Sequence, residues 1–141
     1  MVCDILDKSE FCKKNNATQV NLENLIAKSD LISMHVPHTS LTDKMVNNKF
    51  FHQMKPAAFL INTCRGNVVD QSALKNTLIK GDIAGAALDV FAEEPPIDEE
   101  LLSLSNLMVT PHIGGNAKEA VEAMGGSAIN HLLSFFNDPH K

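Results

Sequence analysis

The chain has 141 residues, enough for one domain with a modest core, and it is 44% hydrophobic and 21% charged, as ordinary globular proteins are. Its formal net charge of −5 argues against a nucleic-acid-binding surface, which needs clustered Lys and Arg. No run approaches the ~18 apolar residues of a membrane span, and no charged-then-apolar leader opens the chain. Three cysteines without metal-type spacing indicate reduced thiols, so we expect a cytoplasmic protein without a metal site.

Short apolar runs alternate with helical patterns along the first half of the chain. Asn21 can cap a helix whose apolar residues keep helical spacing, and Pro37 closes an apolar run. The elements expected here are, in order, the end of a strand at 1–3, a polar loop at 7–16, a brief extended piece at 17–20, a helix from 22, a strand at 31–36, a turn at 39–43 and a helix at 46–54 that turns Val46, Phe50, Phe51 and Met54 inward.

The second half continues the alternation. Asp70 can cap a helix that Gly81 ends through a left-handed turn. The elements expected are a strand at 57–61, a turn at 65–67, a helix up to 80, a strand at 83–91, an acidic loop at 93–100, a strand at 107–110, and a last helix with capping-box spacing at Asn116 and Glu119 and an apolar face of Ala120, Val121, Met124, Ala128, Ile129 and Leu132. We expect residues 137–141 to fray.

Alternating strands and helices predict a parallel sheet with right-handed crossovers. The strands lack polar alternation, which is typical of a sheet covered by helices on both faces. The chain contains no internal repeat and no linker that would divide it. We therefore predict an α/β fold with a doubly wound, Rossmann-like parallel sheet.

The stretch from Leu60 to Asp70 carries the most specific signal. It runs from a buried strand through the turn Arg65-Gly66-Asn67 to the cap of the next helix. A permanently charged guanidinium then lies just past the carboxyl end of a strand, where open parallel sheets bind ligands. The alternative is a surface arginine in a strand-to-helix turn.

Three stretches resemble the D-isomer-specific 2-hydroxyacid dehydrogenases, in the order in which that family carries them. They are Ile61-Asn62-Thr63-Cys64-Arg65-Gly66-Asn67-Val68-Val69-Asp70, Ala84-Gly85-Ala86-Ala87-Leu88-Asp89-Val90-Phe91-Ala92-Glu93-Glu94-Pro95 and Val109-Thr110-Pro111-His112-Ile113-Gly114-Gly115. Three ordered matches are more specific than any single motif. The resemblance implies NAD-linked hydride transfer between a 2-hydroxy acid and a 2-oxo acid.

The resemblance assigns catalytic roles to three residues. Arg65 would clamp the substrate carboxylate, His112 would exchange the hydroxyl proton, and Glu94 would hold the imidazole and stabilise its charged form. Each has an ordinary alternative, since a lone histidine before Ile-Gly-Gly is usually a loop residue and a glutamate in an acidic cluster is usually solvated. The three ordered matches favour the catalytic reading.

The resemblance also implies NAD-binding residues. Asp4, at the end of a strand, would bond the ribose hydroxyls and favour NAD over NADP, the alternative being an ordinary N-terminal surface acid. Asp89 would face the nicotinamide, and as a buried carboxylate it needs partners in any case. The remaining residues expected at the cofactor are His35, Val36, Pro37, Thr42, Thr63, Cys64, Arg65, His112, Gly114 and Gly115.

The family's G-x-G-x-x-G phosphate loop does not occur in these 141 residues. We therefore expect residues 1–141 to form a partial NAD-binding domain that lacks its first strand-helix unit and the substrate domain, and to be inactive alone. Loss of the first strand is expected to orphan the strands at Val2 and Phe59 and to favour a homodimer. The alternatives are a non-catalytic dinucleotide-sensing module, as in the family's corepressors, and a remnant without activity.

Overall fold

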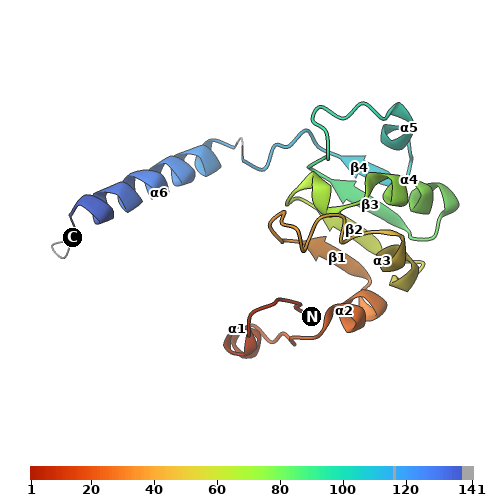
Figure 1. Ribbon diagram of the computed structural model, residues 1–141, viewed down its shortest axis with the longest axis horizontal. Helices are drawn as coiled ribbons and strands as arrows, with labels where there is room; N and C mark the ends of the chain where they lie inside the picture. Colours follow the sequence, from red (N-terminus) through yellow and green to blue (C-terminus); the bar gives the residue numbers. More distant parts are fainter. Residues whose placement is uncertain (116, 138–141) are drawn as a thin grey trace.

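The computed structural model describes residues 1–115 and 117–137. Its centre is a four-stranded parallel sheet in the order β1-β2-β3-β4 (Figure 1). The strands are β1 (Leu31–Met34), β2 (Phe59–Asn62), β3 (Gly85–Leu88) and β4 (Leu107–Val109). In the register, Leu60 lies beside Ile32 and Ala86, and Ala86 lies beside Leu107. The predicted α/β parallel fold is confirmed.

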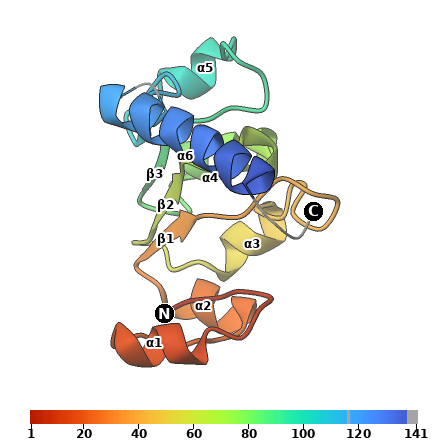
Figure 2. The same cartoon turned by 90° about the vertical axis from the view of Figure 1, so that its left-hand side faces the viewer.

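Helices connect the strands. They are α2 (Leu22–Lys28) before β1, α3 (Asn48–Gln53) between β1 and β2, α4 (Gln71–Lys80) between β2 and β3, and α5 (Glu99–Leu102) between β3 and β4. The helices α3 and α4 lie together on one face of the sheet (Figure 2). Leu60 and Leu74 are fully buried between the layers, and Phe50, Phe51 and Leu78 extend the same core.

The opposite face of the sheet is open in the described structure, whereas the sequence predicted cover on both faces. Leu31, Phe59 and Met108 are 54%, 48% and 67% exposed there. The strand order explains the difference, because right-handed crossovers between strands that follow one another in one direction all lie on the same side. A second layer of helices requires a reversal of strand order, and β1 to β4 contain none.

The strand at Phe59 is not orphaned, so that expectation was wrong. Strand β2 pairs with β1 on one side and with β3 on the other. In the described residues the two edge strands of the sheet are β1 and β4 instead. Val2 forms a parallel bridge with Gln19 only, and this N-terminal pair lies beyond β1 (Figure 1).

Several predicted capping residues act as caps. Asn21 accepts a hydrogen bond from Asn24 N at the start of α2, and Asp70 accepts from Ser72 N and Ala73 N at the start of α4. Gly81 ends α4 with φ of 71°, in the left-handed region that glycine adopts without strain. The caps at Asp70 and Gly81 fix the bounds of α4, the helix that follows the turn at Arg65.

Three predicted boundaries were wrong. The polar stretch 7–16 contains the helix α1 (Ser9–Lys14), which buries Cys12, and α5 begins inside the expected acidic loop at an Asp98 cap. Helix α3 begins at Asn48, because Val46 pairs with Val69 in a parallel bridge and Asn47 is the cap. The start of α3 thus depends on a contact with a residue that follows β2.

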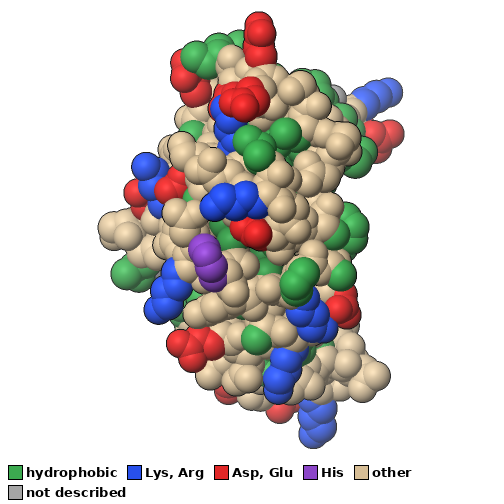
Figure 3. Space-filling model, turned by 90° about the vertical axis from the view of Figure 1, so that its right-hand side faces the viewer, with side chains coloured by type: hydrophobic (Ala, Val, Ile, Leu, Met, Phe, Trp, Pro, Cys, Tyr) green, Lys and Arg blue, Asp and Glu red, His purple; other side chains and the backbone are tan. Residues whose placement is uncertain are grey.

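The last helix, α6 (Lys118–Phe136), extends away from the sheet (Figure 1) and buries no residue. Its N-cap is Ala117, and Asn116 of the expected capping box lies outside the described residues, as do residues 138–141. No helix in the described parts of the chain is long and apolar enough to cross a membrane. On the side away from α6, acidic and basic side chains are interspersed without a region of one sign (Figure 3).

Candidate active site

The turn after β2 is built by a buried asparagine. Asn62 is fully buried; its Nδ2 donates to the Arg65 carbonyl at 3.0 Å, and its Oδ1 accepts from Cys64 N at 3.1 Å. The Cys64 thiol bonds the same oxygen. The Asn62 side chain therefore fixes the backbone of Cys64 and Arg65, and the side chain of Arg65, the one arginine of the chain, is exposed to solvent.

The next residue requires a glycine. A Cβ on Gly66 would lie 1.9 Å from the Phe91 carbonyl carbon and 2.4 Å from Ala92 N. The turn after β2 therefore touches the backbone of the loop after β3 directly. This contact sets the position of Arg65 relative to Glu94, which belongs to that loop.

Glu94 bonds a histidine and its own loop. Its Oε1 accepts from Phe91 N at 3.0 Å, and its Oε2 lies 2.9 Å from Nδ1 of His112. The His112 bond, assisted by Phe91 N–H, holds the pKa of Glu94 below its usual value. An ionised carboxylate only accepts, so Nδ1 of His112 carries the hydrogen in this pair.

His112 has φ of 53°, an unusual conformation for a residue with a side chain. Asp89 supports this conformation: its Oδ1 accepts from Thr110 Oγ1 at 2.6 Å and from Ile113 N at 3.0 Å, and its Oδ2 accepts from Gly114 N at 3.3 Å. These donors, Thr110 first, lower the pKa of Asp89. One carboxylate after β3 thus holds both flanks of His112.

Arg65, Glu94 and His112 line one hollow of about 280 Å³. They come from the loops after β2, β3 and β4, which reach the same end of a parallel sheet. His38, from the loop after β1, lines the hollow as well. The structure therefore brings together the three residues predicted to be catalytic.

The other residues predicted at the cofactor occupy several places. Thr63 and Asp89 line a second, smaller hollow of about 80 Å³ on the open face of the sheet. Gly114 bonds Asp89, and a Cβ on it would lie 3.4 Å from Asp89 Oδ2, whereas Gly115 approaches only Met124. Cys64 lies within the Asn62 turn.

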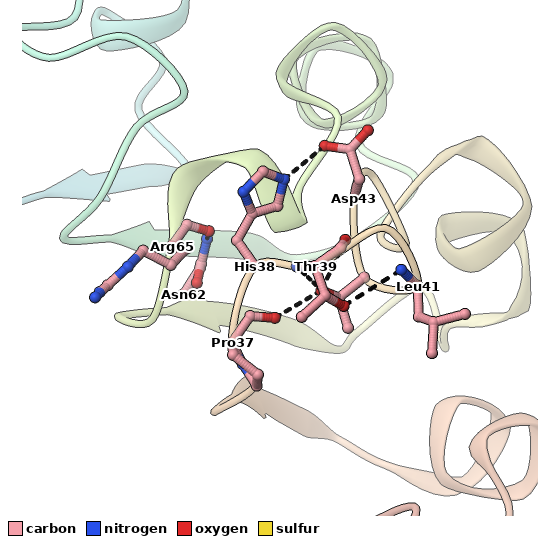
Figure 4. A network of polar contacts seen from close by, with 8 residues as sticks. Pro37, His38, Thr39, Leu41, Asp43, Asn62 and Arg65 are labelled. Atoms are coloured by element: carbon pink, nitrogen blue, oxygen red, sulfur yellow. Dashed lines mark hydrogen bonds and ion pairs between the residues drawn. The ribbon is translucent and has the colours of Figure 1, made fainter.

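The loop after β1 contains four more of the predicted residues (Figure 4). Val36 packs against the core, and the Pro37 carbonyl accepts from the Thr42 hydroxyl at 2.6 Å. Thr42 also accepts from Thr39 N at 2.8 Å, so its hydroxyl closes this loop. His35 is exposed and bonds Ser33 through Nε2 at 2.8 Å.

Asp4 lies apart from these residues, in the N-terminal pair beyond β1 (Figure 1). Its Oδ1 accepts from Leu6 N at 2.9 Å and its Oδ2 lies 3.6 Å from Lys8 Nζ, and the Leu6 N–H chiefly lowers the pKa of Asp4. The structure does not bring Asp4 to the hollow at Arg65.

Sequence reasoning missed three residues of the site. Asn62 and Gly66 fall inside the recognised stretch, but their roles depend on contacts with residues that β2 and β3 bring together. His38 gave no signal beyond its position after Pro37. In the described residues, no group of three His, Cys, Asp or Glu could hold a metal ion.

A parallel sheet with an arginine, a carboxylate and a histidine gathered at its carboxyl end is typical of α/β proteins that bind a ligand at this end of the sheet. Residues 1–114 match the family described as D-isomer specific 2-hydroxyacid dehydrogenase, NAD binding domain. The chain belongs to this family.

Similar proteins carry the names of hydroxy-acid enzymes. The chain is 47% identical over 128 residues to a glyoxylate reductase of Thermococcus litoralis and 41% identical over 119 residues to a glycerate dehydrogenase of Methylorubrum extorquens. These alignments cover 91% and 82% of this chain but 39% and 38% of the relatives. The chain therefore spans about two fifths of the length of the curated relatives it matches.

Solved structures show the same likeness. A glyoxylate reductase from Paecilomyes thermophila superposes with a TM-score of 0.83 at 30% identity, covering 89% of this chain and 38% of that one. A D-lactate dehydrogenase from Aquifex aeolicus, complexed with NAD and lactic acid, gives 0.82 at 29% identity, covering 95% and 45%.

Proposed function

We propose that this chain carries the acid–base and carboxylate-binding residues of an enzyme that interconverts a small 2-hydroxy acid and its 2-oxo acid with NAD. One observation carries the proposal: the hollow is lined by the chain's one guanidinium and by an imidazole that is held by a carboxylate. The names of the similar proteins, which are hydroxy-acid dehydrogenases and glyoxylate reductases, support it.

Arg65 is proposed to bind the substrate carboxylate. A guanidinium offers parallel N–H donors that match the two oxygens of a carboxylate, and it stays charged at every working pH. In the structure Nη1 bonds the Cys64 carbonyl at 2.6 Å, which orients the side chain from its own turn. Asn62 holds the turn itself, so the side chain of Arg65 starts from a fixed backbone position.

His112 is proposed to take and return the proton of the hydroxyl group. Glu94 engages Nδ1, so exchange with a substrate falls to Nε2. The Glu94 carboxylate also stabilises the imidazolium that forms when the proton is taken. The Phe91 N–H holds the other oxygen of Glu94, which keeps the carboxylate and ring aligned.

The residues present fit a nicotinamide cofactor at the open end of β3. Thr63 and Asp89 line the smaller hollow there, and Gly114 leaves the space that a Cβ would take beside Asp89. NAD, when bound, supplies the hydride acceptor of the oxidation. Asp4 retains acceptor capacity for ribose hydroxyls, although Lys8 offsets part of its charge.

The 141 residues are proposed to be inactive by themselves and to bind NAD more weakly than about 1 mM. No G-x-G-x-x-G occurs among them, so no glycine-rich loop and helix N-terminus of this chain holds the pyrophosphate. The hollow at Arg65 is also open, and hydride transfer requires reacting atoms held within about 3 to 3.5 Å.

Two copies of the chain are proposed to associate. The outer edge of β1 offers unpaired backbone groups, and Leu31 and Phe59 are about half exposed beside it. Such edges recruit further strands, and symmetric pairing satisfies both copies at once.

A chimaera tests the proposed activity. This chain replaces the aligned 128 residues of the Thermococcus litoralis glyoxylate reductase, and reduction of glyoxylate is followed by NADH absorbance. We expect turnover, a loss of about a hundredfold in Arg65→Lys and of about a hundredfold or more in His112→Gln. The control, His52→Gln, changes an exposed histidine of α3 that does not line the hollow. Unchanged kinetics in both site variants would remove these residues from the mechanism.

A further inference from the structure

A second imidazole–carboxylate pair lies beside the hollow. His38 Nε2 is 2.8 Å from Asp43 Oδ1 (Figure 4), and His38 lines the same hollow as Arg65 and His112. The proposed reaction needs one cation for the carboxylate and one residue for the proton, and Arg65 and His112 supply both. His38 is therefore a polar group at the site with no part in the chemistry so far described.

The loop that carries His38 is fixed to the turn at Arg65. Asp43 N donates to the Thr39 carbonyl at 2.9 Å, and Lys44 N donates to the Asn67 carbonyl at 2.8 Å. The Thr42 hydroxyl bonds the Pro37 carbonyl within the same loop. His38 is thus placed relative to Arg65 by backbone hydrogen bonds, as a residue that reads a bound substrate must be.

Asp43 sets the chemistry that His38 offers. A carboxylate only accepts, so Nε2 of His38 carries the hydrogen that it donates to Asp43. In the neutral ring, Nδ1 is then an acceptor, and Figure 4 shows this second nitrogen on the Arg65 side of the ring. An acceptor held at that place is suited to a hydroxyl group on the substrate.

We propose that His38 is a specificity-determining residue and that Asp43 positions it. This inference rests on the proposed function, in which Arg65 holds the substrate carboxylate and His112 exchanges the proton of the hydroxyl on the second carbon. His38 then accepts a hydrogen bond from a hydroxyl on the third carbon of the acid. An alkyl substituent there makes no such hydrogen bond, so acids that carry the hydroxyl are preferred.

D-Glycerate and D-lactate differ by this one hydroxyl, and NMR of the imidazole and guanidinium groups of the full chain, with NAD present, compares them. We expect both acids to shift the signals of Arg65 and His112, D-glycerate alone to shift His38, and D-glycerate to bind about tenfold more tightly. In His38→Leu the preference falls below about twofold, because D-glycerate loses its hydrogen bond to the ring. In Asp43→Asn, the NMR signal of the hydrogen on His38 Nε2 weakens. The control His52→Leu keeps the preference.

The outcomes separate this inference from the proposed function. If both acids shift Arg65 and His112 but neither shifts His38, the proposed function stands and the role of His38 is refuted. A tenfold preference that survives His38→Leu refutes it as well. If neither acid shifts the signals of Arg65 or His112, both the proposed carboxylate site and this inference are refuted. The wild-type titration decides the question even where a variant fails to fold.

Discussion

Replacing Gly66 by alanine tests whether the two loops of the site are held by direct backbone contact. The added Cβ would lie 1.9 Å from the Phe91 carbonyl carbon and 2.0 Å from its oxygen. Ordinary contact requires the backbone of residues 91–92 to retreat by about 1.5 Å. That backbone is tied by Phe91 N to Glu94 at 3.0 Å and by Ala92 N to Gln71 at 2.7 Å, so the retreat strains or breaks both bonds.

We expect Gly66→Ala to lower the free energy of unfolding by about 3 kcal/mol, the upper part of the range for overpacked sites, because backbone rather than a side chain must move. Denaturant unfolding followed by circular dichroism measures the change. The imidazole signal of His112 should shift as well, since Glu94 moves with its loop.

Gly126→Ala is the matched control, because a Cβ there meets nothing within 4 Å and alanine is the better helix former by about 1 kcal/mol. The two substitutions should therefore have opposite signs. A Gly66→Ala chain that unfolds within about 0.5 kcal/mol of the wild type would refute the close approach of the two loops.

Three further predictions concern the turn, the carboxylates and the open edge. Asn62→Ala should lower the free energy of unfolding by about 2 kcal/mol or more, since buried groups of the turn lose their partner, while Asn67→Ala should not; equal effects would contradict this role. The pKa values of Asp89 and Glu94 are depressed by folding, so the melting temperature should hold from neutral pH to about 5 and fall as the pH drops below about 4. The fall should be less steep in Asp89→Asn, and the same slope in that variant would exclude Asp89 as a source of the pH dependence. Light scattering should give twice the mass of 15.4 kDa, and a monomer at high concentration would contradict the proposed association.

The alternation of strands and helices was predictable because each strand is a short, largely apolar run, and Pro37 and Pro111 lie just after the first and the last of them. The caps at Asn21, Asp70 and Gly81 were predictable for a related reason, since each acts on residues next to it in the sequence. The convergence of Arg65, Glu94 and His112 followed from the rule that parallel strands end at one edge.

What was missed depends on tertiary contacts. The bridge between Val46 and Val69 moves the start of α3, and no local pattern announces it. The need for glycine at residue 66 comes from a loop 25 residues away in the sequence. The open face of the sheet follows from strand order, which hydrophobic periodicity does not contain.

The order β1-β2-β3-β4 also bears on where the folded chain unfolds locally. Every strand pairs only with its neighbours in the sequence, so each added strand-helix unit extends structure that already exists. Amide hydrogens should accordingly exchange slowest in β2 and β3, which have partners on both sides, and faster toward the outer edge of β1. Arg65 follows β2, one of the two strands with partners on both sides, and His112 follows β4, which is an edge strand. The proton-transfer end of the site should therefore open more often than the end that binds the carboxylate.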